Sequence, residues 1–342
     1  MKAVVIHPPH VLRVEEMALG AAGPHDVTVR IHHGGICGSD LHYYHHGGFG
    51  TVRVQQPMVL GHEIAGTIVA AGAAVTRVRP GDKVAVNPSL PCNICKFCLD
   101  GAQQHCLDMR FFGSAMRSPH VQGGFREELV CHESQAVKAE MPSERAAFAE
   151  PLSVCLHAVR QAGALLGRRV LVTGAGPIGM LCAMVARHAG AREVVVTDLL
   201  DQPLALARRL AADRTVNVGA DSAAMAEYGR DKGHFDVAFE ASGSGLAVAS
   251  AIAALRPGGT LVQVGNGGAE TAVPLNLVVA KEITLRGTFR FHAEFAMAVE
   301  LLARNAIDVA ALLTEIIPLD HAIRAFDLAT DRTRAMKVQI AF

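Results

Sequence analysis

Four cysteines lie close together in one polar stretch of the chain, with the spacing C-x2-C-x2-C-x7-C. They are Cys92, Cys95, Cys98 and Cys106. Four thiolates in one short loop can complete a tetrahedral shell around Zn²⁺, and few other functions require this spacing. A closed Cys₄ shell leaves no position for a substrate, so the spacing predicts a structural zinc site. The alternative, unrelated reduced thiols on a surface loop, is disfavoured because exposed clustered thiols oxidise readily.

A second set of metal-binding residue types is spread over the first half of the chain. Cys37 lies in GICGSD, His62 and Glu63 lie in GHE, and Glu150 lies in FAEPL. A catalytic zinc takes mixed sulfur, nitrogen and oxygen ligands and keeps one position open, which these residues would supply. Each is weak alone, because a lone Cys is usually a small buried apolar side chain. From the residues alone, a catalytic zinc and an ordinary structural role both remain open.

A glycine-rich turn indicates a dinucleotide site. Gly174, Gly176 and Gly179 form G-x-G-x-x-G after an apolar run and before a helical stretch, and Asp198 ends the next apolar run. This pattern brings the pyrophosphate to a helix N-terminus and the carboxylate to the ribose hydroxyls. Residues 199–202 contain no Arg or Lys to bind a 2′-phosphate. The pattern therefore favours NAD over NADP, and a Gly-rich turn with a structural Asp is the weaker alternative.

The elements that must position these residues fall into three regions. In residues 1–150, short β-type runs broken by Gly and Pro predict a small antiparallel, barrel-like domain. In residues 151–286, strand and helix patterns alternate, which predicts an α/β fold with a doubly wound parallel sheet. Residues 287–342 predict a helix and a final strand that pack back onto the first region. The expected strands of the first region are Ala3–Ile6, Val27–Ile31, Glu63–Val69, Lys83–Val86 and Glu128–Val130.

The expected elements of the middle region can be stated individually. The expected strands are Arg169–Thr173, Glu193–Asp198, Thr215–Asn217, Val237–Glu240, Thr260–Val264 and Ile283–Arg286. The expected helices are Ile178–His188, Pro203–Ala212, Ala223–Tyr228 and Gly245–Leu255, and the last region adds a helix over Ala293–Arg304 and a strand over Lys337–Ile340.

The composition of the chain predicts a folded protein and disfavours nucleic-acid-binding and membrane-spanning classes. Hydrophobic residues make up 50% of the chain and charged residues 19%, which is enough to bury a sizeable core. The formal net charge is zero, which disfavours nucleic acid as a partner. The first ten residues hold no signal-peptide core, and no apolar run is long enough to span a membrane. We therefore expect a cytoplasmic protein whose eight cysteines are reduced thiols or metal ligands.

Six motifs occur in order along nearly the whole chain: GICGSD, GHE, the cysteine loop, FAEPL, GAGPIG and LRPGGTLVQVG. Together they resemble the zinc-dependent medium-chain dehydrogenases. The resemblance implies a GroES-like β-rich catalytic domain (1–150, completed by 287–342) and a Rossmann NAD-binding domain (151–286). It also implies two Zn²⁺ per subunit, one held by the cysteine quartet. The catalytic ion would be bound by Cys37, His62 and Glu150, with Glu63 as a ligand or alternate ligand.

The resemblance extends to the cofactor and to the substrate class. Simple alcohol dehydrogenases of this family have a second Cys where this chain has Glu150, so the carboxylate resembles the polyol and sugar-acid branch. The implied reaction is hydride transfer from a secondary alcohol of a sugar acid to NAD. The alternatives are a sorbitol- or xylitol-type polyol dehydrogenase and, more remotely, a catalytically silent relative. The expected cofactor residues are Gly174, Gly176, Pro177, Ile178, Gly179, Asp198, Val264, Gly265, Thr288, Phe289 and Arg290.

One residue departs from the pattern of sorbitol-type enzymes, which carry an Arg five residues after the ribose-binding Asp. This chain has Pro203 there, so contacts to the adenosine half of the cofactor are expected to differ.

Catalysis by this family would require a proton path and a substrate pocket. Ser39 and His42 are expected to relay the proton from the substrate oxygen toward solvent, although His42 also fits a solvated cluster with His45 and His46. A sugar acid requires a cation in the pocket, and the expected substrate residues are Arg290, Arg110, Tyr43 and Phe112. Relatives of this kind form homo-oligomers, and a tetramer or a dimer is expected.

Overall fold

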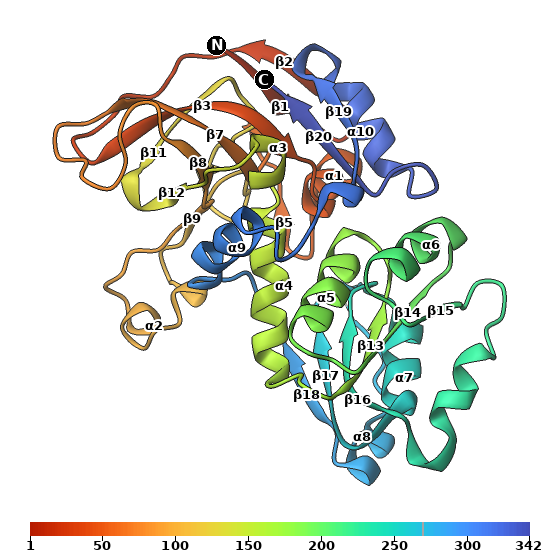
Figure 1. The fold of residues 1–342 in the computed structure, drawn as a ribbon. Helices are drawn as coiled ribbons and strands as arrows, with labels where there is room; N and C mark the ends of the chain where they lie inside the picture. The colour runs from red at the N-terminus through yellow and green to blue at the C-terminus, as the bar shows by residue number, and fades with distance from the viewer. Residues whose placement is uncertain (269) are drawn as a thin grey trace. The chain divides into compact units, whose positions relative to one another are not determined.

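Two sheets organise the computed structural model, one in each of two units (Figure 1). The structure describes residues 1–268 and 270–342. Unit 1 comprises Met1–Ser153 together with Phe291–Phe342, and unit 2 comprises Val154–Arg290. The C-terminal segment therefore returns to the unit formed by the N-terminal part of the chain.

Unit 1 is built on a seven-stranded sheet of order β12-β8-β7-β3-β20-β19, with β11 also paired to β3. All neighbours are antiparallel except β19 and β20. The strands are β3 (Asp26–Gly35), β7 (Glu63–Ala71), β8 (Lys83–Val86), β11 (Glu128–His132), β12 (Ala136–Lys138), β19 (Leu313–Pro318) and β20 (Lys337–Ala341). Because β20 pairs directly with β3, the C-terminal strand is part of this sheet.

Smaller elements complete unit 1. Short sheets are formed by β1 (Lys2–Ile6), β2 (Leu12–Glu16) and β6 (Met58–Val59), by β4 (Gly48–Phe49) and β5 (Val52–Arg53), and by β9 (Ser89–Leu90) and β10 (Arg110–Phe111). The helices are α1 (Gly38–His46), α2 (Lys96–Leu99), α3 (Ser143–Ala146), α9 (Glu294–Ala303) and α10 (Ala322–Thr330), with short 3₁₀ turns η1 (Gln103–His105), η2 (Glu133–Gln135), η4 (Ala310–Leu312) and η5 (Leu319–His321). A further helix, α4 (Ala149–Ala162), begins in this unit and continues into unit 2.

Unit 2 is a six-stranded parallel sheet of order β15-β14-β13-β16-β17-β18. This order confirms the predicted doubly wound sheet, in which ligands bind beyond the carboxyl ends of the strands. The strands are β13 (Arg169–Thr173), β14 (Glu193–Asp198), β15 (Arg214–Asn217), β16 (Phe235–Glu240), β17 (Leu255–Gln263) and β18 (Thr284–Gly287). The other elements are α5 (Pro177–His188), α6 (Asp201–Leu210), η3 (Ala224–Lys232), α7 (Gly245–Ala254) and α8 (Leu275–Lys281).

The bounds of all four predicted helices of unit 2 differ from those in the structure, and two of these differences are informative. The predicted helix over Ala223–Tyr228 is part of the 3₁₀ segment η3, whose regularity is broken at Arg230 and Asp231. The helix predicted to end at Leu255 ends at Ala254, because Leu255 is fully buried and pairs with Phe235 as the first residue of β17. In the second case strand pairing, which single-residue propensities do not contain, decides where the helix ends.

Helix α1 positions several of the candidate residues. Cys37 is its N-cap, and Asp40 closes a capping box by accepting a hydrogen bond from the Cys37 backbone N–H. The helix ends at Gly47, whose φ of 66° lies in the left-handed region that favours glycine. Within the described residues, no helix combines the length and apolarity that a membrane crossing requires.

Candidate metal centres and dinucleotide site

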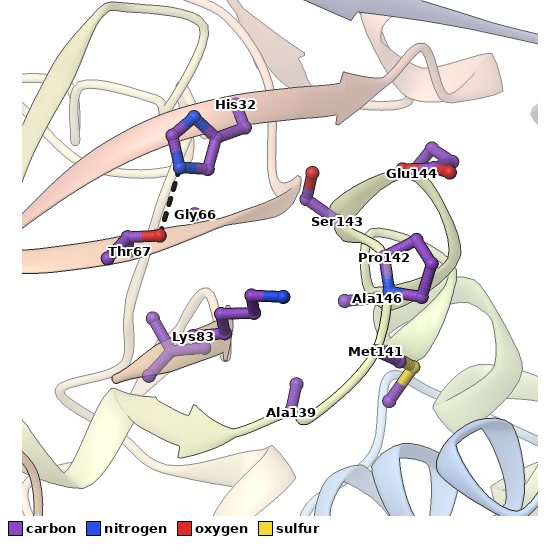
Figure 2. A pocket seen from close by; sticks show the side chains of 11 residues that line it. His32, Gly66, Thr67, Lys83, Ala139, Met141, Pro142, Ser143, Glu144 and Ala146 are labelled. Carbon is purple, nitrogen blue, oxygen red and sulfur yellow. Dashed lines mark hydrogen bonds between the residues drawn. The ribbon is translucent and has the colours of Figure 1, made fainter. Parts of the chain in front are cut away.

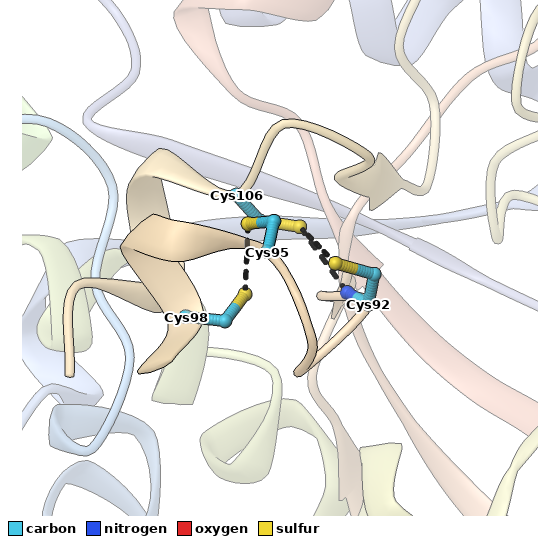
Figure 3. Close-up of side chains that lie close together, drawn as sticks. All are labelled: Cys92, Cys95, Cys98 and Cys106. Atoms are coloured by element: carbon cyan, nitrogen blue, oxygen red, sulfur yellow. Dashed lines mark hydrogen bonds between the residues drawn. The ribbon is translucent and has the colours of Figure 1, made fainter. Parts of the chain in front are cut away.

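The four cysteines predicted to form a structural site converge in one loop of unit 1 (Figure 3). All four sulfurs lie within 4.8 Å of one another, and all four cysteines are free thiols. The Sγ atoms are 3.4 Å apart for Cys106 and Cys92 and 3.6 Å apart for Cys95 and Cys98. These separations exclude disulfides and match the edges of a tetrahedral S₄ shell around an ion with Zn–S lengths of about 2.3 Å.

Backbone N–H groups point at two of these sulfurs. Leu107 N lies 3.5 Å from Cys95 Sγ, and Asp108 N lies 3.3 Å from Cys106 Sγ. Hydrogen bonds from the backbone, that of Leu107 above all, lower the pKa of Cys95 to about 6, whereas burial raises the pKa of Cys98 to about 12. A loop that already holds one thiolate donor at neutral pH, with three more sulfurs around it, fits a zinc ion.

A second group of candidate ligands meets beneath the N-terminus of α1. The ligand atoms of Cys37, His62 and Glu63 all lie within 4.8 Å of one another, and the two latter residues are buried. Within the described residues, no hydrogen bond reaches the buried His62 Nδ1, and the Asp40 Oδ1 atom lies 3.8 Å from it, beyond hydrogen-bond distance. An imidazole nitrogen buried without a partner is costly unless a ligand satisfies it. Together with a thiol and a carboxylate, it fits a metal of mixed S, N and O coordination.

Glu150 lies outside that group of three, in the first turn of α4. It is 6% exposed, and burial raises its pKa to about 8, with the charges of Glu63 and Cys37 acting in the same direction. Burial also raises the pKa of Cys37 to about 11. Both groups thus carry protons at neutral pH in the absence of a cation. A divalent ion that bound to the Cys37 thiol and the Glu150 carboxyl would therefore displace a proton from each.

Two buried residues that the sequence did not single out hold this group together. Asp40 is fully buried, and its carboxylate accepts hydrogen bonds from Cys37 N at 3.0 Å and from Gly61 N at 3.2 Å. Lys337 lies on β20 and places its Nζ 2.6 Å from Glu63 Oε1 and 3.0 Å from the Ile36 carbonyl oxygen. Asp40 was within the GICGSD motif, but nothing in its sequence context separates a buried anchor from a helix cap.

Ser39 and His42, the expected proton carriers, both lie on α1. Ser39 is half-buried in the first turn of the helix, two residues after Cys37. His42 is exposed, and burial of its inner part together with His46 lowers its pKa. The helix thus joins a residue beside the candidate metal ligands to an imidazole at the surface.

The glycine-rich turn of unit 2 has the geometry that a dinucleotide needs. Gly174 has φ 89°, and a Cβ added there would lie 2.9 Å from Ser242. A Cβ on Gly179 would lie 1.8 Å from the Gly174 carbonyl oxygen, so that only glycine allows α5 to pack against the strand. A Cβ on Gly176 would meet nothing within 4 Å and would instead project into open space at the start of α5. That open space at a helix N-terminus fits a pyrophosphate.

Asp198 ends β14 beside this turn and is 5% exposed. Its Oδ2 accepts a hydrogen bond from Ala175 N at 2.7 Å, and its Oδ1 accepts one from Leu199 N at 2.7 Å. The carboxylate therefore fixes the conformation of the turn. Pro177 and Ile178 form the first turn of α5.

The remaining expected cofactor residues follow the ends of β17 and β18. Val264 N and Gly265 N donate to the Glu240 carbonyl oxygen at 2.8 and 2.7 Å, and Thr288 N donates to the Gln263 carbonyl oxygen at 3.2 Å. A cavity of about 310 Å³ lies at this edge of unit 2, with Gln263 and Gly265 in its wall. These positions are at the carboxyl end of the parallel sheet, where nucleotides bind in doubly wound folds.

Comparison with known proteins agrees with this geometry. Residues 23–142 match the family model of the alcohol dehydrogenase GroES-like domain, and residues 177–304 match that of the zinc-binding dehydrogenases. The chain belongs to the zinc-dependent medium-chain dehydrogenases. It is therefore an oxidoreductase of a zinc- and nicotinamide-dependent family, as the sequence motifs predicted.

Individual members of the family are similar over nearly the whole chain. L-idonate 5-dehydrogenase (NAD(P)(+)) of Escherichia coli is 43% identical over 92% of this chain and 91% of its own length. Sorbitol dehydrogenase of Gallus gallus is 37% identical over 99% of this chain and 95% of its own length. The crystal structure of L-idonate 5-dehydrogenase from Escherichia coli matches with a TM-score of 0.96 at 40% identity, covering 100% of this chain and 98% of that one.

The residues expected to bind the substrate of this medium-chain dehydrogenase lie in different surroundings. Arg290 has φ 53°, a left-handed conformation that is strained for a non-glycine residue, and its guanidinium lies over the Phe289 ring at 5.0 Å. Arg110 is exposed on β10, and Phe112 is half-buried. Tyr43 is only 2% exposed, and its hydroxyl accepts a hydrogen bond from Ala115 N at 3.1 Å. Their roles in substrate binding remain predictions.

A further cavity, of about 210 Å³, lies elsewhere in unit 1 (Figure 2). Its wall includes Lys83 and Ser143, together with His32, whose Nε2 lies 2.9 Å from Thr67 Oγ1. None of the residues expected to bind metal, cofactor or substrate contributes to it. This cavity is therefore separate from the site that the family uses.

Proposed function

We propose that this protein is an NAD-dependent dehydrogenase that oxidises L-idonate to 5-keto-D-gluconate and catalyses the reverse reduction. The similarity to L-idonate 5-dehydrogenase over nine-tenths of both chains carries this proposal. Glu150 supports it, because a carboxylate at this place in the motif distinguishes the polyol and sugar-acid branch from simple alcohol dehydrogenases. The substrate is a small sugar acid, and neither nucleic acid nor membrane is a partner.

The proposed metal content is two Zn²⁺ per subunit. Cys92, Cys95, Cys98 and Cys106 would hold a structural ion, and Cys37, His62 and Glu150 would hold the catalytic ion. Glu63 would serve as an alternate ligand, with Lys337 holding its carboxylate when it is not bound to metal. The catalytic ion supplies Lewis acidity that makes the substrate hydroxyl more acidic. We assign this ion to the group around Cys37, because the closed Cys₄ shell has no position for substrate.

The residues of the chain then provide binding, orientation and a proton path. The N–H groups at the start of α5 and the Asp198 carboxylate would orient NAD by its pyrophosphate and ribose. Ser39 would accept the proton released from the substrate hydroxyl. From Ser39 the proton would pass by way of the cofactor ribose to His42, which is exposed one helical turn further along α1 and would release it to solvent. Its lowered pKa keeps the imidazole neutral and ready to accept a proton.

Recognition of a sugar acid requires a cation for the carboxylate. Arg290 is the preferred candidate, because its strained backbone conformation is the kind retained at binding sites. Arg110, with Phe112 and Tyr43 as further pocket residues, is the second candidate. A catalytic domain of residues 1–150 completed by 287–342, and a NAD-binding domain of residues 151–286, would divide these tasks. We propose a cytoplasmic homo-oligomer, a tetramer or a dimer.

Initial rates with a panel of substrates test the proposal. With NAD as cofactor, L-idonate should give a kcat/KM at least tenfold above those for D-gluconate, sorbitol and xylitol. NADH formation at 340 nm is the readout, and metal analysis should give two zinc ions per subunit in the active material. Turnover of sorbitol and xylitol alone would contradict the sugar-acid substrate.

A sorbitol- or xylitol-type polyol dehydrogenase is the second candidate. The 37% identity to a sorbitol dehydrogenase favours it, and the Glu150 motif fits it equally well. Pro203, which stands where sorbitol-type enzymes carry an Arg, weighs against it. A protein that binds NAD but turns over no member of the panel would indicate a catalytically silent relative.

A further inference from the structure

Four imidazoles form a continuous strip on unit 1, of which the proposed reaction uses only one. The strip consists of His10, His45, His46 and His42 in that order. Their ring centroids are 5.3 Å apart for the first pair, 6.0 Å for the second and 5.9 Å for the third. The loop that carries His10 is attached to α1 by a hydrogen bond of 2.8 Å from His10 N to the Tyr44 carbonyl oxygen.

Two members of this strip are placed as a pair. His42 and His46 are four residues apart on α1, so their side chains project from the same helical face one turn apart. Both are exposed, and in the part of the chain that the structure describes neither imidazole makes a hydrogen bond or ion pair. His45, in contrast, places its Nε2 2.8 Å from Thr330 Oγ1. The ring nitrogens of His42 and His46 are thus available to a ligand from solvent.

The separation of the two rings suits a shared metal ion. With Zn–N lengths of about 2.0–2.1 Å, two imidazoles on one tetrahedral ion have their centroids roughly 5 Å apart. The observed 5.9 Å needs only small side-chain rotations to reach this value. The pair also lies at the C-terminal end of α1, where the helix dipole favours a cation. Partial burial and the neighbouring His46 lower the pKa of His42, so its neutral, metal-binding form prevails near neutral pH.

We propose that His42 and His46 form a third metal site, distinct from the two sites of the family, that binds a divalent transition ion such as Zn²⁺ reversibly from solvent. Water would complete the coordination shell, so binding is weaker than at either thiolate-containing site. The site has a consequence that depends on the proposed function. An ion on His42 occupies the nitrogen that the relay needs, so free Zn²⁺ inhibits proton release.

Calorimetric titration of Zn²⁺ into the fully zinc-loaded protein tests the site, with two single variants as comparison. Wild type should bind one additional ion per subunit. His46→Ala should weaken this binding at least tenfold, because one of the two ligands is lost. His10→Ala removes a neighbouring exposed imidazole outside the pair and should leave the affinity within twofold of wild type. The absence of an additional ion, wild-type affinity in His46→Ala, or loss of binding in His10→Ala would each overturn the site.

Turnover measured at the same Zn²⁺ concentrations tests separately whether His42 acts in the proton relay. Wild-type turnover should fall in parallel with occupancy of the third site. His46→Ala retains His42 and should need at least tenfold more Zn²⁺ for the same inhibition. A third ion that binds as described but leaves turnover unchanged would support the site and contradict the relay role proposed for His42.

Discussion

Lys337 and Glu63 form a buried ion pair between β20 and β7, with Lys337 Nζ 2.6 Å from Glu63 Oε1. The two side chains are 3% and 1% exposed and lie 274 residues apart in the sequence. Burial alone would lower the pKa of Lys337, but Glu63 and Cys37 outweigh this effect and raise it. The C-terminal strand thus delivers the countercharge for a candidate metal ligand.

Replacing Lys337 by Met should therefore be strongly destabilising. The change leaves the Glu63 carboxylate buried without its partner, which costs about 3–5 kcal/mol in the free energy of unfolding. Urea denaturation of the zinc-loaded protein measures this cost. The double variant Lys337→Met/Glu63→Gln is the control and should regain most of the stability, because no uncompensated charge remains. A single variant as stable as wild type would show that the pair contributes nothing.

The two candidate metal centres should lose zinc independently. Cys37→Ser should remove one of two zinc ions and reduce turnover at least 1,000-fold, because the ion it loses would supply the Lewis acidity. Cys95→Ser should remove the other ion and mainly lower the thermal stability of the loop and of unit 1. Metal analysis, together with thermal denaturation followed by circular dichroism, distinguishes the two results. Full turnover in Cys37→Ser would contradict the assignment of the catalytic site.

Zinc binding at the catalytic site should strengthen as pH rises. The pKa values of about 11 for Cys37 and about 8 for Glu150 mean that both groups are protonated at pH 6–7 without metal and must lose their protons to bind it. Each released proton makes the affinity rise about tenfold per pH unit. Chelator competition between pH 6 and 7.5 gives the slope. In Glu150→Gln the slope of log affinity against pH should fall by about one, because one proton fewer is released. An unchanged slope would exclude Glu150 as a ligand.

Local sequence signals were sufficient for much of the fold and for the metal quartet. The strands β8, β13 and β14 have the predicted bounds, because each is an apolar run ended by clear turn residues. The cysteine spacing predicted a group of four sulfurs, since all four ligands come from one loop. Short-range patterns of this kind depend little on the rest of the chain.

The residues that hold the second metal centre in place could not be predicted from local sequence patterns. Lys337 is an unremarkable cation at the start of a predicted strand, and only the pairing of β20 with β3 brings it to Glu63. Gly35 is another example, because a Cβ there would lie 2.1 Å from Glu63 Oε2. Asp40, in turn, is buried and accepts a hydrogen bond from Gly61 N in the loop before β7. These contacts depend on long-range packing, which motifs do not encode.

Asp198 should determine the preference for NAD over NADP. Its carboxylate would bind the ribose hydroxyls and repel a 2′-phosphate, so Asp198→Asn should lower the ratio of kcat/KM for NAD to that for NADP at least tenfold. Asparagine keeps one acceptor oxygen for Ala175 N but loses the acceptor for Leu199 N, so thermal denaturation of the variant accompanies the rates. Asp201→Asn, an exposed carboxylate three residues later, is the matched control and should leave the ratio unchanged.

Arg290 should discriminate sugar acids from uncharged polyols. A charge-assisted hydrogen bond contributes about 1.5–3 kcal/mol, so Arg290→Met should reduce kcat/KM for L-idonate roughly 10–150-fold. The same variant should change kcat/KM for sorbitol much less, because sorbitol has no carboxylate. Arg304→Met removes an exposed cation at the end of α9 and should affect neither substrate. Equal losses on both substrates would mean that Arg290 acts on the cofactor or on the fold, and Arg110 would then be the remaining candidate for the carboxylate.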